Sequence, residues 1–314
     1  MNDNLKSYAD AMMDASSIIT QLNPDFIVAP MLGSIPFIDA MAIVDSNFDP
    51  TKVVYMPASS RIKEINNVMK NWYTNFLEDI VDFPYEFPRI VGIDEVVSGS
   101  SVTRCMNAVD IASNRIRRGL KQKLMARLHS KNPEVSLKAI SDVDVLTNSN
   151  YASEFSEMSD SIRNGDYLRD KDKARENSKF VKSVIEDKLN LEFKYLTIGV
   201  EDSKNSQKQK QYADLKLEGR ILPVEVQSII TMDNPKFCPA RYQRLPNVRS
   251  NSYVGYSPTI QDFVVTPEYI DFLSSLAAYI GKDPDKVHPV NMNAILNSSK
   301  YLGSDSLAEE IDTQ

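Results

Sequence analysis

Apolar residues along this chain occur either in short uninterrupted runs or at helical spacing within longer segments. The runs in "DFIVAP", "KVVYMP" and "RIVGI" are short and bounded by polar residues, as expected for strands covered on both faces of a parallel sheet. Residues 4–22 and 61–80 instead place their apolar side chains on one helical face. Strands that alternate with helices predict an α/β fold with a doubly wound, mostly parallel sheet.

The pattern changes after Gly119. Residues 121–190 are rich in Ser, Asn, Asp and Lys and helical in tendency, which predicts a helical insertion or cap. Two further strands are predicted within 193–202 and 220–233, separated by a polar loop or exposed helix. The sequence thus predicts an N-terminal part of the core, an insertion, and the remainder of the core with a C-terminal tail: 1–120, 121–190 and 191–314.

Composition narrows the classes of function. A formal net charge of −7 argues against a nucleic acid that covers the whole surface, because phosphate binding needs a positive field. With only two cysteines and two histidines, neither a disulfide framework nor a structural zinc site is predicted. No apolar run reaches the length of a membrane span, and "MNDNLKSYADAMMDASS" lacks the apolar segment of a signal peptide. We therefore expect a cytoplasmic protein with no membrane partner.

One strand–loop–helix unit concentrates polar residues where ligands bind. In "RIVGIDEVVSGSSVTR", Asp94 and Glu95 follow an apolar run and precede a Ser/Gly turn, after which helical spacing begins. The carboxyl ends of strands in open α/β sheets are the usual ligand sites. The plainer interpretation is a solvated strand end, with Ser98 or Ser100 capping the helix.

The same residues carry a resemblance to a family. "IVGIDEVVSGSS" resembles the ribose-phosphate signature of the type I phosphoribosyltransferases, in which two acids precede a Thr/Gly-rich loop and a helix. The resemblance implies that Asp94 and Glu95 are catalytic residues that bind the ribose hydroxyls of phosphoribosyl pyrophosphate, since ionised carboxylates accept hydrogen bonds. It also implies a 5-phosphate loop at the positive helix end, where Gly99 lets the backbone approach the ligand. That loop comprises Ser98, Gly99, Ser100 and Ser101.

Two upstream segments extend the resemblance, which covers about residues 20–118. "PDFIVAPMLGSIPFIDAM" is similar to the first strand and pyrophosphate loop of the family. "MPASSRIKE" stands where the family has its flexible loop, so Ser60 and Arg61 are implied to close over the leaving pyrophosphate, with Lys63 as an alternative cation. The residues implied to form the pyrophosphate loop are Met31, Leu32, Gly33 and Ser34.

The sequence departs from the family pattern in several ways, one of which is the lack of an Arg or Lys within "PMLGS". The 5-phosphate loop is one residue short, because only Ser98 precedes its glycine. Glu95 stands where the family usually has Asp, and Ser34 replaces the second glycine of the pyrophosphate loop. Because these departures lie in the ligand-binding loops, they weaken the expectation of catalytic turnover more than the expectation of the fold.

The resemblance implies a pentosyltransferase whose transition state has oxocarbenium character. Mg²⁺ is expected to bridge the pyrophosphate and the ribose hydroxyls, with few direct protein ligands. Homodimers are usual in the family, and the acceptor is not identified. One alternative is a non-catalytic sensor or effector that binds a nucleotide, a protein or a nucleic acid, as divergent members that accompany bacterial anti-phage systems and retrons suggest. Another is glycosidase-like cleavage at ribose C1.

Two further groups of residues have both a functional and a structural interpretation. A cluster of cations could bind nucleic acid or a protein partner, although a solvated helical face explains it more simply. It comprises Arg115, Arg117, Arg118, Lys121, Lys123 and Arg127. Aromatic residues in the Pro- and Tyr-rich stretch 234–258 stand where a family hood would stack on a base, but loop aromatics more often anchor a loop to the core. They are Phe237, Tyr242, Tyr253 and Tyr256.

Overall fold

A computed structural model gives the fold. It describes residues 2–81, 87–165, 171–188, 193–204, 207–227, 235–246 and 253–303. The chain divides into two compact units, which are described separately. The first unit combines three stretches, Met1–Phe76, Pro88–Ala112 and Lys194–Gln314, and the second combines Leu77–Phe87 with Ser113–Phe193.

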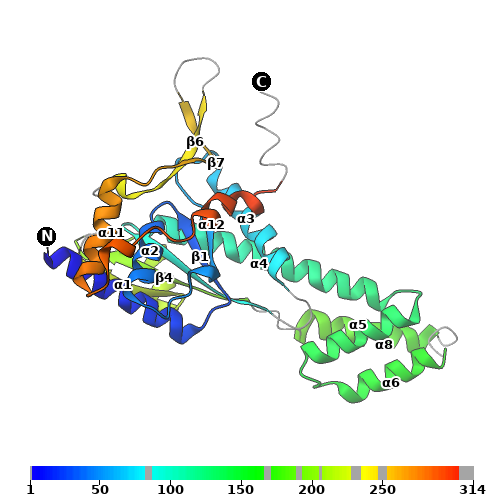
Figure 1. Ribbon diagram of the computed structural model, residues 1–314. Coiled ribbons are helices and arrows are strands. Elements are labelled where there is room, and N and C mark those ends of the chain that lie inside the picture. Colours follow the sequence, from blue (N-terminus) through cyan, green and yellow to red (C-terminus); the bar gives the residue numbers. More distant parts are fainter. Residues whose placement is uncertain are drawn as a thin grey trace. The chain divides into compact units, whose positions relative to one another are not determined.

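A five-stranded parallel sheet forms the centre of the first unit (Figure 1). The strands are β1 (Phe26–Met31), β2 (Val53–Pro57), β3 (Arg89–Val96), β4 (Lys194–Asp202) and β5 (Ile221–Val226). Their order across the sheet is β2-β1-β3-β4-β5. The predicted α/β fold with a parallel sheet is therefore confirmed. Of the last predicted strand, residues 228–233 lie outside the described residues.

Burial explains the apolar runs of these strands. Val28, Ala29 and Ile93 have no exposed surface, because helices cover both faces of the sheet. β3 does not end with its apolar run but continues through Asp94 and Glu95 to Val96. Both acids are therefore fixed by the sheet instead of standing on a loop.

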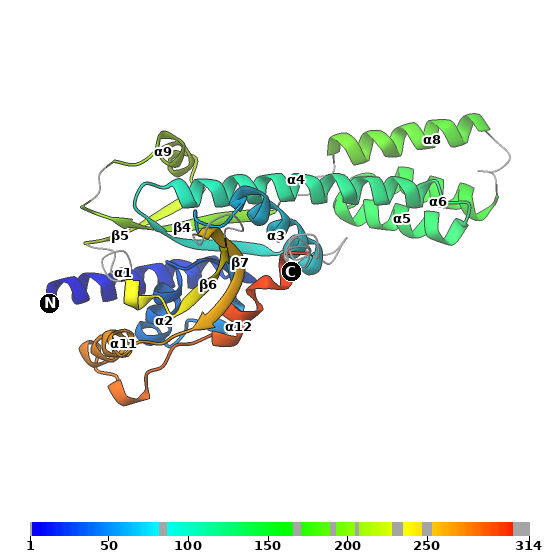
Figure 2. The same ribbon diagram turned by 90° about the horizontal axis from the view of Figure 1, so that it is seen from above.

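Helices flank the sheet on both faces (Figure 2). On one face the Tyr8 ring of α1 packs against Phe37 of α2 and Phe272 of α11, with ring centroids 6.0 and 5.4 Å apart. On the other face Phe76 of α3 packs on Phe26, at 5.5 Å, and α4 and α9 share an apolar cluster with β3 and β5. The bounds of these helices are α1 (Asn2–Leu22), α2 (Ile35–Val44), α3 (Ile65–Ile80), α4 (Ser100–Leu128), α9 (Lys210–Leu217) and α11 (Pro267–Tyr279).

A small antiparallel hairpin of β6 (Ala240–Pro246) and β7 (Tyr253–Phe263) completes the first unit. Its register shifts at several positions, so its side chains do not alternate strictly between the two faces. Short helical elements connect the larger ones: η1 (Pro50–Lys52), η3 (Pro235–Phe237), η4 (Pro284–Lys286), α12 (Met292–Leu296) and η5 (Asn297–Tyr301).

The second unit is helical, which confirms the predicted helical insertion. Besides the C-terminal part of α4, it contains α5 (Pro133–Leu146), α6 (Ala152–Arg163), α8 (Lys171–Ser183) and a π-helical turn, Val184–Lys188. Asn132 caps α5 by accepting a hydrogen bond from Glu134 N at 3.0 Å. Phe155 packs against Tyr151 and Phe180 between the helices, with ring centroids 6.3 and 5.9 Å away.

Candidate functional site

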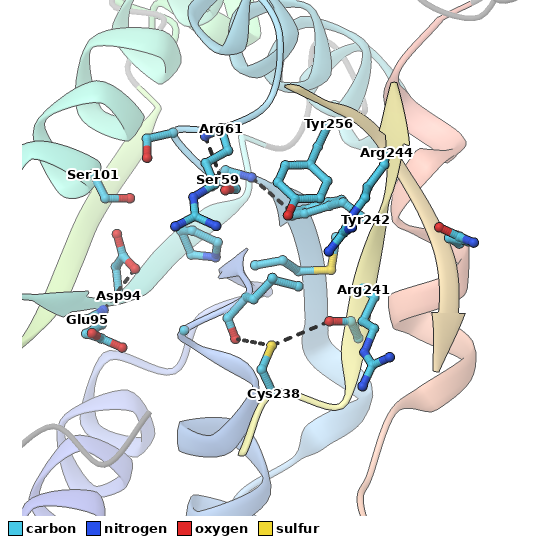
Figure 3. Close-up of a pocket in the computed structure, with 18 of the residues that line it drawn as sticks. Ser59, Arg61, Asp94, Glu95, Ser101, Cys238, Arg241, Tyr242, Arg244 and Tyr256 are labelled. Atoms are coloured by element: carbon cyan, nitrogen blue, oxygen red, sulfur yellow. Dashed lines mark hydrogen bonds between the residues drawn. The ribbon is translucent and has the colours of Figure 1, made fainter. Parts of the chain in front are cut away.

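A cavity of about 820 Å³ opens in the first unit at the carboxyl edge of the sheet. Its walls come from the ends of β1, β2 and β3, the first turn of α4 and the β6–β7 hairpin (Figure 3). Parallel strands end at the same edge of a sheet, so loops that are distant in the sequence meet there. The cavity is thus a meeting point of the segments that the sequence singled out.

Residues from all three predicted loops line this cavity. They are Met31, Leu32 and Gly33 after β1, Ser60 and Arg61 after β2, and Asp94, Glu95 and Ser101 at the junction of β3 with α4. Four other predicted residues are not part of its lining: Ser34, Ser98, Gly99 and Ser100.

Ser34 supports the turn between β1 and α2 instead of facing the cavity. Its side chain is fully buried, and its hydroxyl donates to Pro30 O at 2.5 Å. This bond closes the turn that presents Leu32 and Gly33 to the cavity. The peptide bond between Met31 and Leu32 is cis.

Gly33 leaves room for one of the two acids. A Cβ at position 33 would stand 2.8 Å from Glu95 Oε2, closer than such contacts occur. The loop after β1 therefore contacts the carboxylate at the end of β3 directly. The resemblance assigned Gly33 to a loop that contacts pyrophosphate, whereas here its lack of a side chain makes room for Glu95.

The predicted 5-phosphate loop is covered on one side by α9 and the segment before it. Gly99 has a φ of +82°, and a Cβ there would lie 2.5 Å from the Tyr212 ring. The Tyr212 hydroxyl donates to Glu201 Oε1 at 2.6 Å, which fixes the ring in place. Lys208 Nζ donates to Val96 O and Val97 O, at 3.1 and 2.8 Å. Glycine is thus required by the close approach of Tyr212, whereas the sequence suggested the approach of a ligand.

Asp94 is a buried carboxyl group, not a solvated one. Only 5% of its surface is exposed, Oδ1 accepts a hydrogen bond from Glu95 N at 2.9 Å, and Oδ2 is buried without a hydrogen-bond partner. Burial raises the pKa of Asp94 to about 7, while the nearby Ser101 hydroxyl opposes the rise and the Glu95 charge adds to it. A ligand that brings hydroxyl donors or a cation to Oδ2 would favour the ionised form.

The segment after β2 is joined to the hairpin through its main chain. Tyr256 N donates to Arg61 O and Lys63 N donates to Tyr256 O, each at 3.1 Å, and Ile62 forms a parallel bridge with Tyr256. Ala58 N also donates to the Tyr242 hydroxyl at 3.3 Å. The segment predicted as a flexible loop is therefore hydrogen-bonded to β7 through its main chain. Arg61 projects from it into the cavity (Figure 3).

Several lining residues were not predicted from the sequence. Arg104 is the fifth residue of α4, Cys238 lies just before β6, and the hairpin contributes Arg241, Arg244, Gln261 and Asp262. The only local signal for Arg104 is its spacing of three residues from Ser101, which places both on one helical face. These hairpin residues had no signal of their own, because tertiary contacts bring the hairpin to the sheet edge. Tyr242 and Tyr256, named as hood aromatics, do line the cavity.

The predicted cluster of cations is not part of the lining of this cavity. The cluster from Arg115 to Arg127 belongs to the second unit, where Arg127 pairs with Asp142 at 2.6 Å. Trp72 of α3, also outside the lining, is fully buried and donates through Nε1 to Ser298 O at 3.0 Å, so it belongs to the packed core. Cys105 is buried, and desolvation raises its thiol pKa well above the usual value.

Within the part of the chain that the structure describes, no group of three or more His, Cys, Asp or Glu side chains could hold a metal ion. Among the described helices, none is long and apolar enough to cross a membrane. Comparisons with protein-family profiles, with curated protein sequences and with solved structures find no match.

Proposed function

We propose that this protein binds phosphoribosyl pyrophosphate, or a related nucleotide, and transfers or cleaves the group at ribose C1. The observation that carries the proposal is the convergence of three βα loops on one cavity, with Asp94 and Glu95 at its base. The same loops carry the resemblance to type I phosphoribosyltransferases. The order of strands and helices through β3 and α4 agrees with that resemblance.

The cavity has the charges that such a ligand needs. Cations from three segments line it, together with the acids Asp94, Glu95 and Asp262. The cations are Arg61, Arg104, Arg241 and Arg244. Guanidinium groups suit phosphate oxygens, and carboxylates suit ribose hydroxyls. A sugar that carries both phosphate and free hydroxyls matches both kinds of group.

In this proposal Asp94 and Glu95 accept hydrogen bonds from the ribose hydroxyls and stabilise positive charge that develops at C1. Arg61 contacts the leaving pyrophosphate, and the hairpin excludes water. The buried, unpartnered Oδ2 of Asp94 fits a role next to a hydroxyl or a hydrated Mg²⁺. Bound with the ligand, Mg²⁺ would neutralise charge on the pyrophosphate.

A second candidate is a sensor that binds the ligand without turnover. The covering of Gly99 by Tyr212 and the position of Ser98 and Ser100 outside the lining favour it, because they leave a smaller phosphate loop than the resemblance implies. A sensor of this kind needs no acceptor.

The test is incubation of the full chain with phosphoribosyl pyrophosphate and Mg²⁺, with nucleobases as acceptors, while pyrophosphate release and thermal stability are measured. An enzyme releases pyrophosphate, and a glycosidase-like activity does so without any acceptor. A sensor gains thermal stability alone. Asp94→Asn with Glu95→Gln should remove either response, whereas Glu218→Gln, at an exposed position after α9, should change neither. If the unsubstituted protein shows no release and no stabilisation, the proposal is wrong.

A further inference from the structure

Arg104 has the features of a residue that binds a ligand in this cavity. It is the fifth residue of α4, three residues after Ser101, and both residues line the cavity. Residues three apart on a helix share a face. The two side chains therefore lie on the same part of the cavity wall, which Asp94 also lines.

The protein compensates the Arg104 side chain only in part, through an electrostatic interaction with Asp94. Its Nε is buried and has no hydrogen-bond partner. None of the ion pairs formed among the described residues includes Arg104. A guanidinium has five donors and no acceptor, and a buried donor without a partner is unfavourable. A hydrogen-bond acceptor bound in the cavity would satisfy Nε.

The position of Arg104 on the helix narrows the nature of that acceptor. The free N–H groups of the first turn of α4 carry partial positive charge and favour an anion, as does the Arg104 guanidinium one turn later. The acceptor that suits both groups is therefore negatively charged. Asp94 forms no ion pair with Arg104, and its own Oδ2 is buried and unpartnered.

The predicted 5-phosphate loop supplies little of what a phosphate needs. Only Ser101 of that loop lines the cavity, and Tyr212 covers Gly99. A phosphate in this cavity therefore sits one helical turn further along α4 than the sequence implied. The Ser101 hydroxyl points toward the cavity in Figure 3, on the side where Arg61 also enters.

We propose that Arg104, together with Ser101, binds the sugar-linked phosphate monoester of the ligand and replaces the residue that the shortened loop lacks. The inference rests on the proposed function, because it assigns one part of the same cavity. It makes Arg104 a binding residue that determines specificity for phosphorylated over free sugars. Arg61, on the other segment, remains the contact for pyrophosphate.

The experiment is calorimetric titration of the full chain with ribose 5-phosphate, ribose and inorganic pyrophosphate. Arg104→Gln should weaken the binding of ribose 5-phosphate by about tenfold or more, as expected for the loss of a charge-assisted hydrogen bond. It should leave pyrophosphate binding unchanged, and Arg104→Lys should restore part of the loss. Arg118→Gln, at an exposed position on α4, is the matched control and should have no effect.

Stability of the ligand-free protein gives a second readout. Because Nε has no partner, Arg104→Gln should not lower the melting temperature, whereas a structural arginine would. The inference is overturned if Arg104→Gln binds ribose 5-phosphate as well as the unsubstituted chain does, weakens pyrophosphate equally, or unfolds the protein. If the unsubstituted chain binds phosphoribosyl pyrophosphate but not ribose 5-phosphate, only this inference fails. If it binds neither, the proposed function fails as well.

Discussion

Gly33 and Glu95 lie so close together that a Cβ at position 33 would stand 2.8 Å from Glu95 Oε2. The two residues come from loops that the sequence identified separately, one after β1 and one at the end of β3. Their contact shows that the loops form a single wall of the cavity. The position of the Glu95 carboxylate therefore depends on the absence of a side chain at residue 33.

Gly33→Ala should impair ligand binding more than folding. The clash is with the flexible end of the Glu95 side chain, which can move, so we expect the free energy of unfolding to fall by no more than about 1 kcal/mol. The displaced carboxylate should weaken stabilisation by phosphoribosyl pyrophosphate in a thermal-shift titration. Gly119→Ala is a control, since nothing lies within 4 Å of a Cβ there. A Gly33→Ala protein with unchanged ligand response would contradict the proposed role of Glu95.

Gly99→Ala should destabilise the fold itself. The new Cβ would stand 2.5 Å from the Tyr212 ring, and the backbone φ of +82° is unfavourable for alanine. Overpacking and the strained φ together should cost about 2–4 kcal/mol in urea unfolding. Gly219→Ala separates the two effects, because φ there is +72° but nothing lies within 4 Å of a Cβ. If both variants lose the same free energy of unfolding, the Tyr212 ring moves aside without an energetic cost.

Asp94 should make stability fall as pH rises. Its folded-state pKa is raised from 3.8 to about 7, so the folded protein holds a proton that the unfolded chain releases between those values. The stability that this proton provides is present at low pH and is lost as pH approaches about 7. Asp94→Asn removes the titration, so relative to the unsubstituted chain it should gain roughly 2–3 kcal/mol between about pH 5 and about pH 8. Urea unfolding at both pH values measures the difference. A gain that does not change with pH would show that Asp94 keeps an ordinary pKa.

Tyr242→Phe should loosen the segment that carries Arg61. The variant removes the hydroxyl that accepts from Ala58 N at 3.3 Å, which leaves a buried amide without a partner. We expect a loss of about 1 kcal/mol and faster amide exchange in residues 58–64, measured by hydrogen exchange with mass spectrometry. Tyr279→Phe changes an exposed tyrosine and should leave this exchange as it was. Unchanged exchange in Tyr242→Phe would mean that the bonds to Tyr256 hold the segment by themselves.

Local patterns were sufficient for the elements of the fold. Apolar runs marked β1, β2 and β3 because strands covered on both faces bury nearly every side chain. Helical spacing marked α1 and the insertion for a similar reason. The apolar run did not by itself show that β3 continues through Asp94 and Glu95 to Val96, because hydrogen bonds to the neighbouring strand keep these polar residues in the sheet.

The residues of the site were only partly accessible to sequence reasoning. Asp94, Ser101 and Gly33 could be named because each stands next to a strand end, where parallel sheets present their loops. Arg104 had only a helical spacing to mark it. Arg244 and Cys238 had no signal, because they follow β3 by more than a hundred residues and reach the cavity through the packing of the hairpin and the segment before it.

The sequence by itself determined the alternation of strands and helices and the loops at the sheet edge, because burial and backbone preference act over a few residues. Only the tertiary structure decided that Tyr212 covers Gly99, that Arg61 is joined to β7 and that Arg104 faces the cavity. Those relationships depend on side chains from distant segments competing for the same space. No local pattern in the chain encodes that competition.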